Sequence, residues 1–177
     1  MTNPKEYGRA LFLLAEEEGS TEEVLSDAVT VREVFREHGD YAKLLNTPAL
    51  EKEERLRLAD ESLKTVNKHL KSLVKILAQE HAAHTVASTI DGFIAAYEES
   101  RGIEHATVIS AVPLSDTELS RLKEKLERLT SKTFIIECEV DPSILGGIKL
   151  RYMGRQLDSS LRTKLDSFAN NLMKTIV

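Results

Sequence analysis

The chain has 177 residues, of which 41% are hydrophobic and 30% charged, with a formal net charge of −5 and a single cysteine. No apolar run approaches the ~20 residues that cross a bilayer, and one cysteine excludes an internal disulfide. The acidic balance argues against nucleic acid as the main partner. A globular protein of one or two small domains remains.

Helical spacing of apolar residues runs through the first 102 residues. Asn3-Pro4 is a favourable helix start, and Gly19 and Gly39 mark the ends of the first two helices. The sequence from Ser20 to Glu23 predicts a capping box at the second helix. We expect six amphipathic helices with short connections, which predicts an antiparallel bundle, over residues 4–18, 20–38, 41–46, 49–63, 66–77 and 86–101.

Alternating apolar residues replace the helical period after Gly102. Strands are expected at Thr107–Val112, Phe134–Val140, Ile148–Tyr152 and Arg155–Leu157. The sequence from Ser115 to Glu118 predicts a second capping box, opening a helix whose apolar side is Leu119, Leu122, Leu126 and Leu129. The last helix begins at Asp158 or Ser159, with an apolar face of Leu161, Leu165, Phe168, Leu172 and Ile176. The order β-α-β-β-β-α predicts an α+β fold, with domains 1–102 and 103–177.

A rigid corner separates two of the predicted strands. Pro142 fixes its own φ and favours an extended Asp141. Gly146 and Gly147 permit positive φ or a close backbone contact before the chain straightens again. Ile148, Leu150 and Tyr152 then share one strand face. Taken physically, the segment predicts a β-corner.

Residue patterns typical of catalysis or metal binding are weak. His81 and His84 are three apart but lack zincin spacing and an obvious third ligand, so a helix-end role is favoured over a metal site. The residues after Gly146-Gly147 do not match a phosphate-binding loop. Cys138 alternates with apolar neighbours between two glutamates, which predicts a buried small side chain. We expect no active site and no cofactor.

The first helix is apolar around most of its middle. Tyr7, Leu11 and Leu14 share one face, while Phe12 and Leu13 point well away from it. Either the helix is surrounded by its own bundle, or it packs on one side and offers another to a partner helix. Ile76 widens the apolar face of the fifth helix in the same way. The sequence leaves both interpretations open.

Five motifs resemble the δ subunits of ATP synthases, whose mitochondrial relative is the oligomycin-sensitivity-conferring protein. They are the opening helix Tyr7–Phe12, the bend Leu44–Pro48, the junction Gly102-Ile103, the corner Val140–Arg151 and the helix entry Leu157–Leu161. They span nearly the whole chain in order.

The resemblance implies a non-catalytic stator subunit that joins the catalytic head to the peripheral stalk. Residues 1–102 would bind the amino-terminal helix of an α subunit, and residues 103–177 the b subunits. The implied α-subunit site is Tyr7, Ala10, Leu11, Leu14, Leu70, Leu73, Ile76 and Leu77; the implied stalk site is Leu161, Leu165, Phe168 and Leu172; the structural signature is Asp141, Pro142, Gly146 and Gly147.

The resemblance also implies a place at the cytoplasmic face of a bacterial plasma membrane, held through the complex without direct insertion. The first residues lack the pattern of a cleaved targeting segment. The main alternative is a free-standing helical adaptor unrelated to ATP synthase, which would use the same apolar grooves. An RNA-binding protein is a weaker alternative, since it would need exposed aromatic residues on adjacent strands and only Phe134 and Tyr152 are available. A hydrolase that uses the histidine pair is another weaker alternative, and it should lose activity with a chelator.

Overall fold

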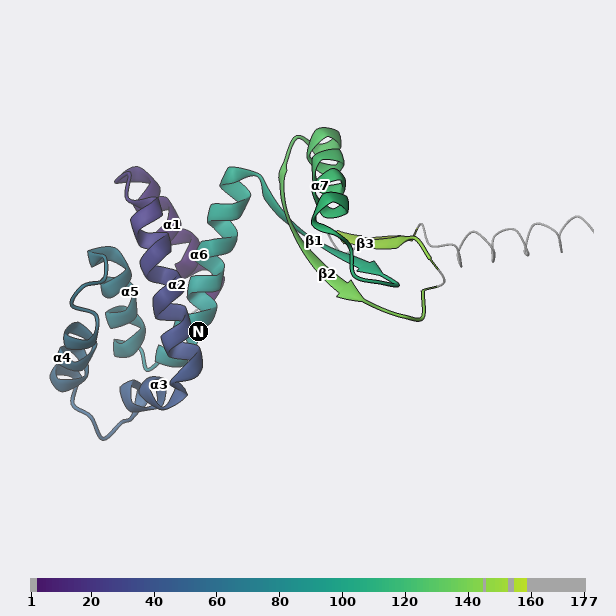
Figure 1. The fold of residues 1–177 in the computed structure, drawn as a ribbon. Helices are drawn as coiled ribbons and strands as arrows, with labels where there is room; N and C mark the ends of the chain where they lie inside the picture. The colour runs from purple at the N-terminus through teal and green to yellow at the C-terminus, as the bar shows by residue number, and fades with distance from the viewer. Residues whose placement is uncertain (1–2, 145, 153–154, 159–177) are drawn as a thin grey trace, which may run out of the picture. The chain divides into compact units, whose positions relative to one another are not determined.

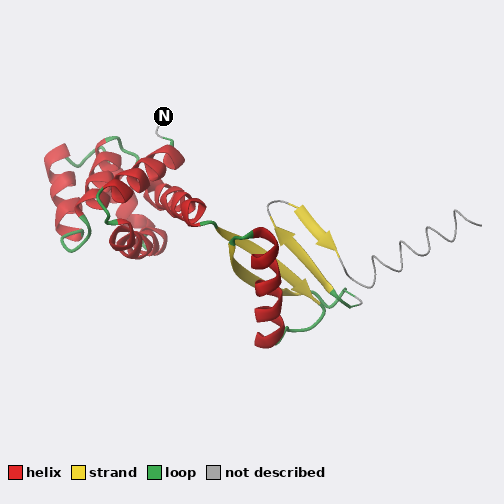
Figure 2. Cartoon of the chain, turned by 90° about the horizontal axis from the view of Figure 1, so that it is seen from above, coloured by secondary structure: helices red, strands yellow, loops and turns green. Residues whose placement is uncertain are grey.

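A computed structural model describes residues 3–144 and 146–152, and the backbone of residues 155–158 (Figures 1 and 2). The chain divides into two compact units, Met1–Ser100 and Arg101–Val177. The first is helical and the second combines helix and sheet, so the fold is α+β. Within the described residues, no helix is both long and apolar enough to cross a bilayer.

Helices make up the whole first unit. They are α1 Pro4–Glu17, α2 Thr21–Glu37, α3 Gly39–Asn46, α4 Lys52–Ser62, α5 Lys68–Gln79, a 3-10 turn at Ala83–Thr85, and α6 Val86–Arg101. One continuous apolar core unites them, and its largest fully buried side chains include Phe93, Leu45, Leu70 and Leu77. The buried positions of each helix recur every three or four residues, as an amphipathic helix requires.

The ends of α1 and α2 show one correct prediction and one wrong one. Asn3 caps α1 by accepting the Lys5 amide at 3.2 Å, with Pro4 at the first helical position. The predicted capping box at Ser20 is absent, because the Ser20 backbone is not extended (φ −106°, ψ 15°). Its amide instead donates to the carbonyl of Ala15 at 2.9 Å, which ends α1. Closing one helix thus prevents the geometry that would cap the next.

Helix α1 approaches α6 very closely. A Cβ atom on Gly8 would overlap the backbone of Thr89 and Phe93, and one on Gly92 would lie 3.0 Å from Cα of Lys5. The missing side chains allow Phe12 to meet Phe93 edge to face, with ring centroids 6.3 Å apart. Two glycines therefore set the distance between these helices.

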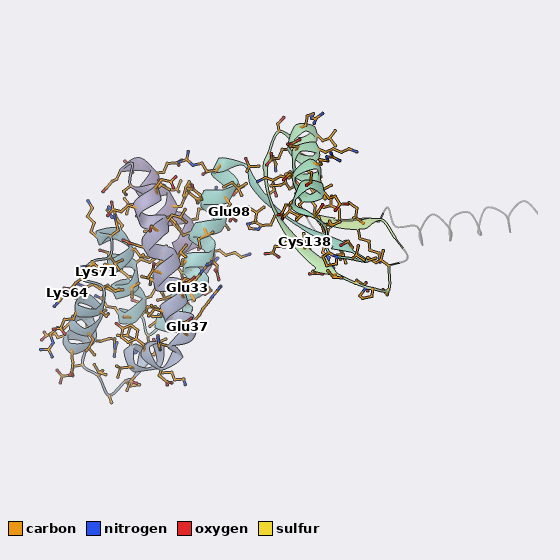
Figure 3. All side chains as sticks on the ribbon, viewed as in Figure 1. Glu33, Glu37, Lys64, Lys71, Glu98 and Cys138 are labelled. Atoms are coloured by element: carbon orange, nitrogen blue, oxygen red, sulfur yellow. The ribbon has the colours of Figure 1, made fainter. Side chains whose placement is uncertain are left out.

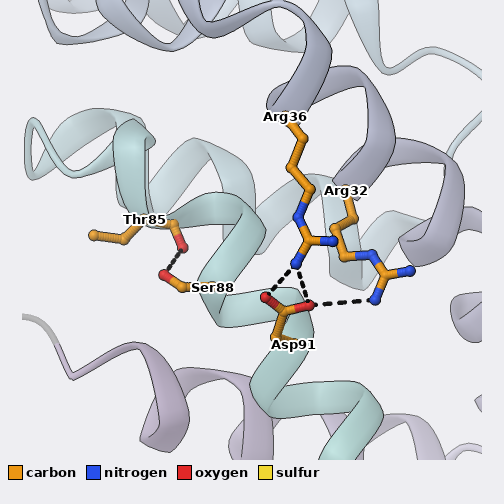
Figure 4. A network of polar contacts seen from close by, with 5 residues as sticks. All are labelled: Arg32, Arg36, Thr85, Ser88 and Asp91. Carbon is orange, nitrogen blue, oxygen red and sulfur yellow. Dashed lines mark hydrogen bonds and ion pairs between the residues drawn. The ribbon is translucent and has the colours of Figure 1, made fainter. Parts of the chain in front are cut away.

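Polar contacts also fix α6 and the short helices. Asp91 of α6 accepts hydrogen bonds from Arg36 at 2.7 and 2.9 Å and from Arg32 at 3.2 Å, which joins α6 to α2 (Figure 4). Arg55 of α4 is buried, although the sequence pattern assigned only apolar residues to that face. It donates to the carbonyls of Leu50 and Thr47 at 2.9 and 3.2 Å. A buried guanidinium is tolerated because carbonyls surround it.

In the part of the second unit that the structure describes, one helix covers a mixed sheet. Its elements are β1 Ile103–Ser110, α7 Asp116–Thr130, β2 Thr133–Val140, β3 Ile148–Tyr152 and β4 Arg155–Asp158, and the strand order is β2-β1-β3-β4. β1 pairs in parallel with β2 and antiparallel with β3, and β3 is antiparallel to β4. Side chains of α7 pack on a cluster formed by Ala106, Val108, Phe134 and Leu150.

Two boundaries in this unit differ from the prediction. β1 begins at Ile103, not Thr107, because it pairs with β2 from its first residue. It ends at Ser110, whose hydroxyl donates to the carbonyl of Val112 and leaves Val112 exposed. The capping box at Ser115 is confirmed, with the Ser115 amide donating to the Glu118 carboxylate at 2.9 Å.

The last turn of α7 also differs from the prediction. Leu129 is 73% exposed and does not join the apolar side of the helix. Glu127 lies near the start of β2 instead, where its carboxylate accepts the Phe134 amide at 3.1 Å. This end of the helix therefore meets the sheet through a hydrogen bond between a side-chain carboxylate and a backbone amide.

The predicted corner links β2 to β3. The Asp141 amide donates to the Ser110 carbonyl at 2.9 Å, and its carboxylate accepts the Ser143 amide at 2.9 Å. Hydrogen bonds from Ser143, first from its side chain and then from its amide, lower the pKa of Asp141. Gly146 and Gly147 have φ of 149° and 82°, which confirms the first of the two predicted possibilities, positive φ.

The prediction that Cys138 is buried is wrong: the side chain is exposed (Figure 3). β2 is an edge strand, and the apolar cluster under α7 includes Phe134 and Ile136 from this strand but not Cys138. The alternation of apolar residues correctly predicts on which side of β2 the Cys138 side chain lies. Whether that side chain is buried depends on how much of the sheet α7 covers. The predicted last helix, from Ser159 onward, lies outside the described residues.

Candidate partner-binding site

A groove lies between α1 and α5. Its cavity measures about 280 Å³ and is lined by Tyr7, Ala10, Leu11, Leu14, His69, Ser72, Leu73 and Ile76. Six of the eight residues proposed from the sequence are therefore brought together in one place. The two helices run in opposite directions, because Glu18 after the end of α1 contacts Lys68 at the start of α5.

The groove has a buried floor and exposed apolar walls. Leu11 and Leu73 are buried and belong to the core as well as to the cavity. Leu14 and Ile76 are 40% and 45% exposed, and the neighbouring Leu13 is 54% exposed. Exposed large apolar side chains gathered around a groove are typical of surfaces that bind another chain.

Leu70 and Leu77 occupy a different position from the other six residues. Both are fully buried in the core of the first unit, and neither lines the cavity. They hold α5 against the bundle and so position the residues that face the groove. The helical period of α5 separates these two roles, since Leu73 and Ile76 lie on an adjacent face.

A polar contact closes one end of the groove. The Glu18 carboxylate accepts hydrogen bonds from Lys68 Nζ at 2.9 Å and His69 Nε2 at 2.7 Å. The hydrogen bond from Lys68, followed by that from His69, lowers the pKa of Glu18. The contact fixes the spacing of the two helices at this end.

Sequence reasoning missed His69 and Ser72 as groove residues. Both are polar, whereas the predicted groove residues were chosen for their apolar side chains. Their spacing contained the signal, because positions 69, 72, 73 and 76 recur every three or four residues and so share one side of α5.

A second cavity, of about 630 Å³, lies between α1 and α6. Its lining is more polar, and its apolar residues are small: it consists of Asn3, Pro4, Lys5, Arg9, Ser88, Asp91, Gly92, Ala95, Ala96 and Glu99. Asp91 is already held by the two arginines of α2. Large apolar side chains are missing from this lining, unlike that of the α1–α5 groove.

The two histidines of the weak metal motif have structural partners. Nδ1 of His81 lies 3.2 Å from the Asn46 carbonyl and Nε2 lies 3.3 Å from Arg55. Nδ1 of His84 lies 3.0 Å from the Asn46 amide nitrogen. Among the described residues, no three acidic, histidine or cysteine side chains could hold a metal ion together. Both histidines help to hold the end of α3 against the segment after α5.

The remaining predicted sites divide between the corner and the C-terminal segment. Asp141, Pro142, Gly146 and Gly147 form the corner after β2, where their contacts maintain the backbone. The proposed stalk residues Leu161, Leu165, Phe168 and Leu172 lie outside the described residues.

Fold and groove together define an α+β protein whose helical unit presents an apolar groove of a kind that suits a helix from another chain. Residues 4–172 match the family described as "ATP synthase delta (OSCP) subunit", and the chain belongs to this family.

Individual relatives agree with the family match. The chain is 36% identical over 163 residues to "ATP synthase subunit delta" of Azorhizobium caulinodans, covering 91% of this chain and 88% of the relative. It is 34% identical over 172 residues to the protein of the same name from Lachnoclostridium phytofermentans, covering 96% and 94%. Its fold resembles a chain of the Toxoplasma gondii mitochondrial ATP synthase hexamer, with a TM-score of 0.67, 18% identity and 98% of each chain covered.

Proposed function

We propose that this protein works as a peripheral-stalk subunit of a proton-translocating ATP synthase and joins the catalytic head to the stalk against the torque of the rotor. The family match over residues 4–172 supports this role and leaves no support for an unrelated adaptor. The observation that carries the proposal is the groove between α1 and α5. In this proposal the amino-terminal helix of an α subunit occupies the groove.

The role is mechanical and needs no chemistry from this chain. A turning rotor drags the head unless a stator holds it, and apolar area removed from water supplies a strong contact. Leu14 and Ile76, which line the groove, are each nearly half exposed. Covering these two side chains contributes roughly 2–3 kcal/mol before the cost of ordering the partner.

The finer assignments belong to the same proposal. Residues 1–102 form an antiparallel six-helix bundle that binds the head, and residues 103–177 form the α+β domain that binds the b subunits. The stalk contact uses the predicted last helix through Leu161, Leu165, Phe168 and Leu172. The protein lies at the cytoplasmic face of the bacterial membrane, peripheral to it through the complex, and uses neither a cofactor nor nucleic acid.

Substitutions at exposed groove residues test the head contact. Leu14→Asp and Ile76→Asp place a charge where the partner helix would lie but leave the buried floor intact. Each should weaken binding of the full-length protein to purified head by at least about tenfold, since a buried unpaired charge is costly. Val34→Asp is the matched control, because Val34 is a similarly exposed apolar residue of α2. Equal binding by all three variants would refute the groove assignment.

A further inference from the structure

The wall of the groove that belongs to α1 is acidic. Glu6 and Glu17 are four residues before Ala10 and three after Leu14, so both lie along the same side of α1 as these groove residues. Both are exposed, and neither side chain forms a hydrogen bond or ion pair with another described residue. The basic side chains of α1, Lys5 and Arg9, line the cavity on the α6 side instead.

The opposite wall is basic. Lys68 and Lys75 of α5 are four residues before and three after Ser72, and α5 contains three lysines and no acidic residue. Nearby acidic groups only partly balance them. Lys68 contacts Glu18 at 2.9 Å and Lys75 contacts Asp60 at 3.1 Å.

The hydrogen bond from Lys75 is the largest cause that lowers the pKa of Asp60. Lys71 and Lys64, which Figure 3 labels, lower it further through their positive charge. The α5 side of the groove therefore keeps an excess of positive charge.

We propose that these opposite walls select an amphipathic helix with basic residues along one edge of its apolar face and acidic residues along the other, and that they fix the direction in which this helix lies. The inference rests on the proposed function, since it concerns the occupant of the same groove. If the bound helix is rotated by 180° so that its two ends change places while its apolar face still points into the groove, its two edges change places as well. Only one direction then places acidic residues beside α5 and basic residues beside α1.

The dimensions suit a short helical segment. From Tyr7 to Leu14 the floor follows two turns of α1, about 10 Å at 1.5 Å per residue. Apolar contacts provide most of the affinity, while exposed charges contribute little each and act on direction, association rate and salt dependence. A helix with the same charge along both edges meets one wall of like charge in either direction.

Synthetic helical peptides test the proposal on the full-length protein. Three 20-residue peptides share their leucine positions: one has an acidic and a basic edge, the second has these edges exchanged, and the third has two acidic edges. At low salt the first two should bind equally and about 3- to 10-fold more tightly than the third. The first two peptides, which have one acidic and one basic edge, are called split-edge peptides. In NMR spectra, a nitroxide at the peptide amino terminus should broaden the amide signals near Tyr7 with one split-edge peptide and those near His69 with the other.

Charge reversal on one wall sharpens the test. Glu6→Lys with Glu17→Lys makes both walls basic, so the peptide with two acidic edges should become the tightest and the split-edge peptides should lose their single direction. The control is Glu33→Lys with Glu37→Lys, the same charge change at two exposed positions of α2 (Figure 3). It should leave the order of affinities unchanged.

The outcomes separate this inference from the proposed function. If all peptides bind equally and in mixed directions, while Leu14→Asp still abolishes binding, the charge rule is wrong and the groove assignment stands. If Leu14→Asp leaves both peptide and head binding unchanged, the groove itself is not the site.

Discussion

The two sides of α1 show how one helix can serve folding and binding separately. Towards α6, Gly8 brings the backbones so close that no side chain fits between them. Towards α5, Leu11 reaches the core while Leu14 remains partly exposed above it. Close packing contributes stability on one side, and incomplete packing leaves apolar surface for a partner on the other. Substitutions on the two sides should therefore affect different measurements.

The largest effect is expected where α1 meets α6. Gly8→Val should lower the free energy of unfolding by about 3 kcal/mol or more, because the new side chain would overlap the backbone of Thr89 and Phe93. Thermal or urea unfolding followed by circular dichroism measures the change. Gly39→Ala is the control, since a Cβ there meets nothing within 4 Å. Similar stability of the two variants would show that α6 is not packed against Gly8.

The groove itself should show a division between its floor and its wall. Leu11→Ala should lower the free energy of unfolding by about 2–4 kcal/mol, as expected for a buried leucine. Leu14→Ala should lower it by only about 1 kcal/mol, since 40% of the side chain is already exposed in the folded protein. Head binding should weaken in both, but Leu14→Ala should weaken it with much the smaller loss of stability. A large loss of stability in Leu14→Ala would contradict this division.

The smallest effect concerns the contact that closes the groove. The pKa of Glu18 is lower in the folded protein, so its contact with Lys68 stabilises the fold at pH values above the unfolded pKa. That contribution is lost as the pH falls through the folded pKa. Glu18→Gln should therefore lower Tm slightly at pH 7, and the difference from the unmodified protein should shrink between about pH 5 and pH 3.

Glu17→Gln is the matched control for this measurement, because Glu17 is exposed and makes no ion pair with a described residue. Its effect on Tm should be small and nearly independent of pH. A difference for Glu18→Gln that persists unchanged at pH 3 would mean that the contact is not electrostatic.

Local sequence signals predicted features that depend on neighbouring residues alone. The start of α1 at Pro4, the capping box at Ser115 and the glycines of the corner all follow from backbone preferences that act over a few residues. The spacing of Tyr7, Leu11 and Leu14 likewise placed them on one side of a helix. These inferences needed no knowledge of the fold.

Other predictions failed because distant contacts decide them. Ser20 matches a capping motif as well as Ser115 does, yet its amide closes α1. Arg55 is buried because carbonyls from the segment before α4 converge on it. Cys138 and Leu129 are exposed because α7 covers only part of the sheet. Sequence periodicity gives the side of an element but not what lies opposite it.

For this protein the sequence by itself determined the family, the helical and alternating segments and the residues that share each face. Only the tertiary structure decided that Leu70 and Leu77 belong to the core while Leu14 and Ile76 border an open groove with oppositely charged walls. The physical reason is that residue spacing fixes directions around one helix, whereas burial and electrostatic complementarity arise between helices that are far apart in the chain.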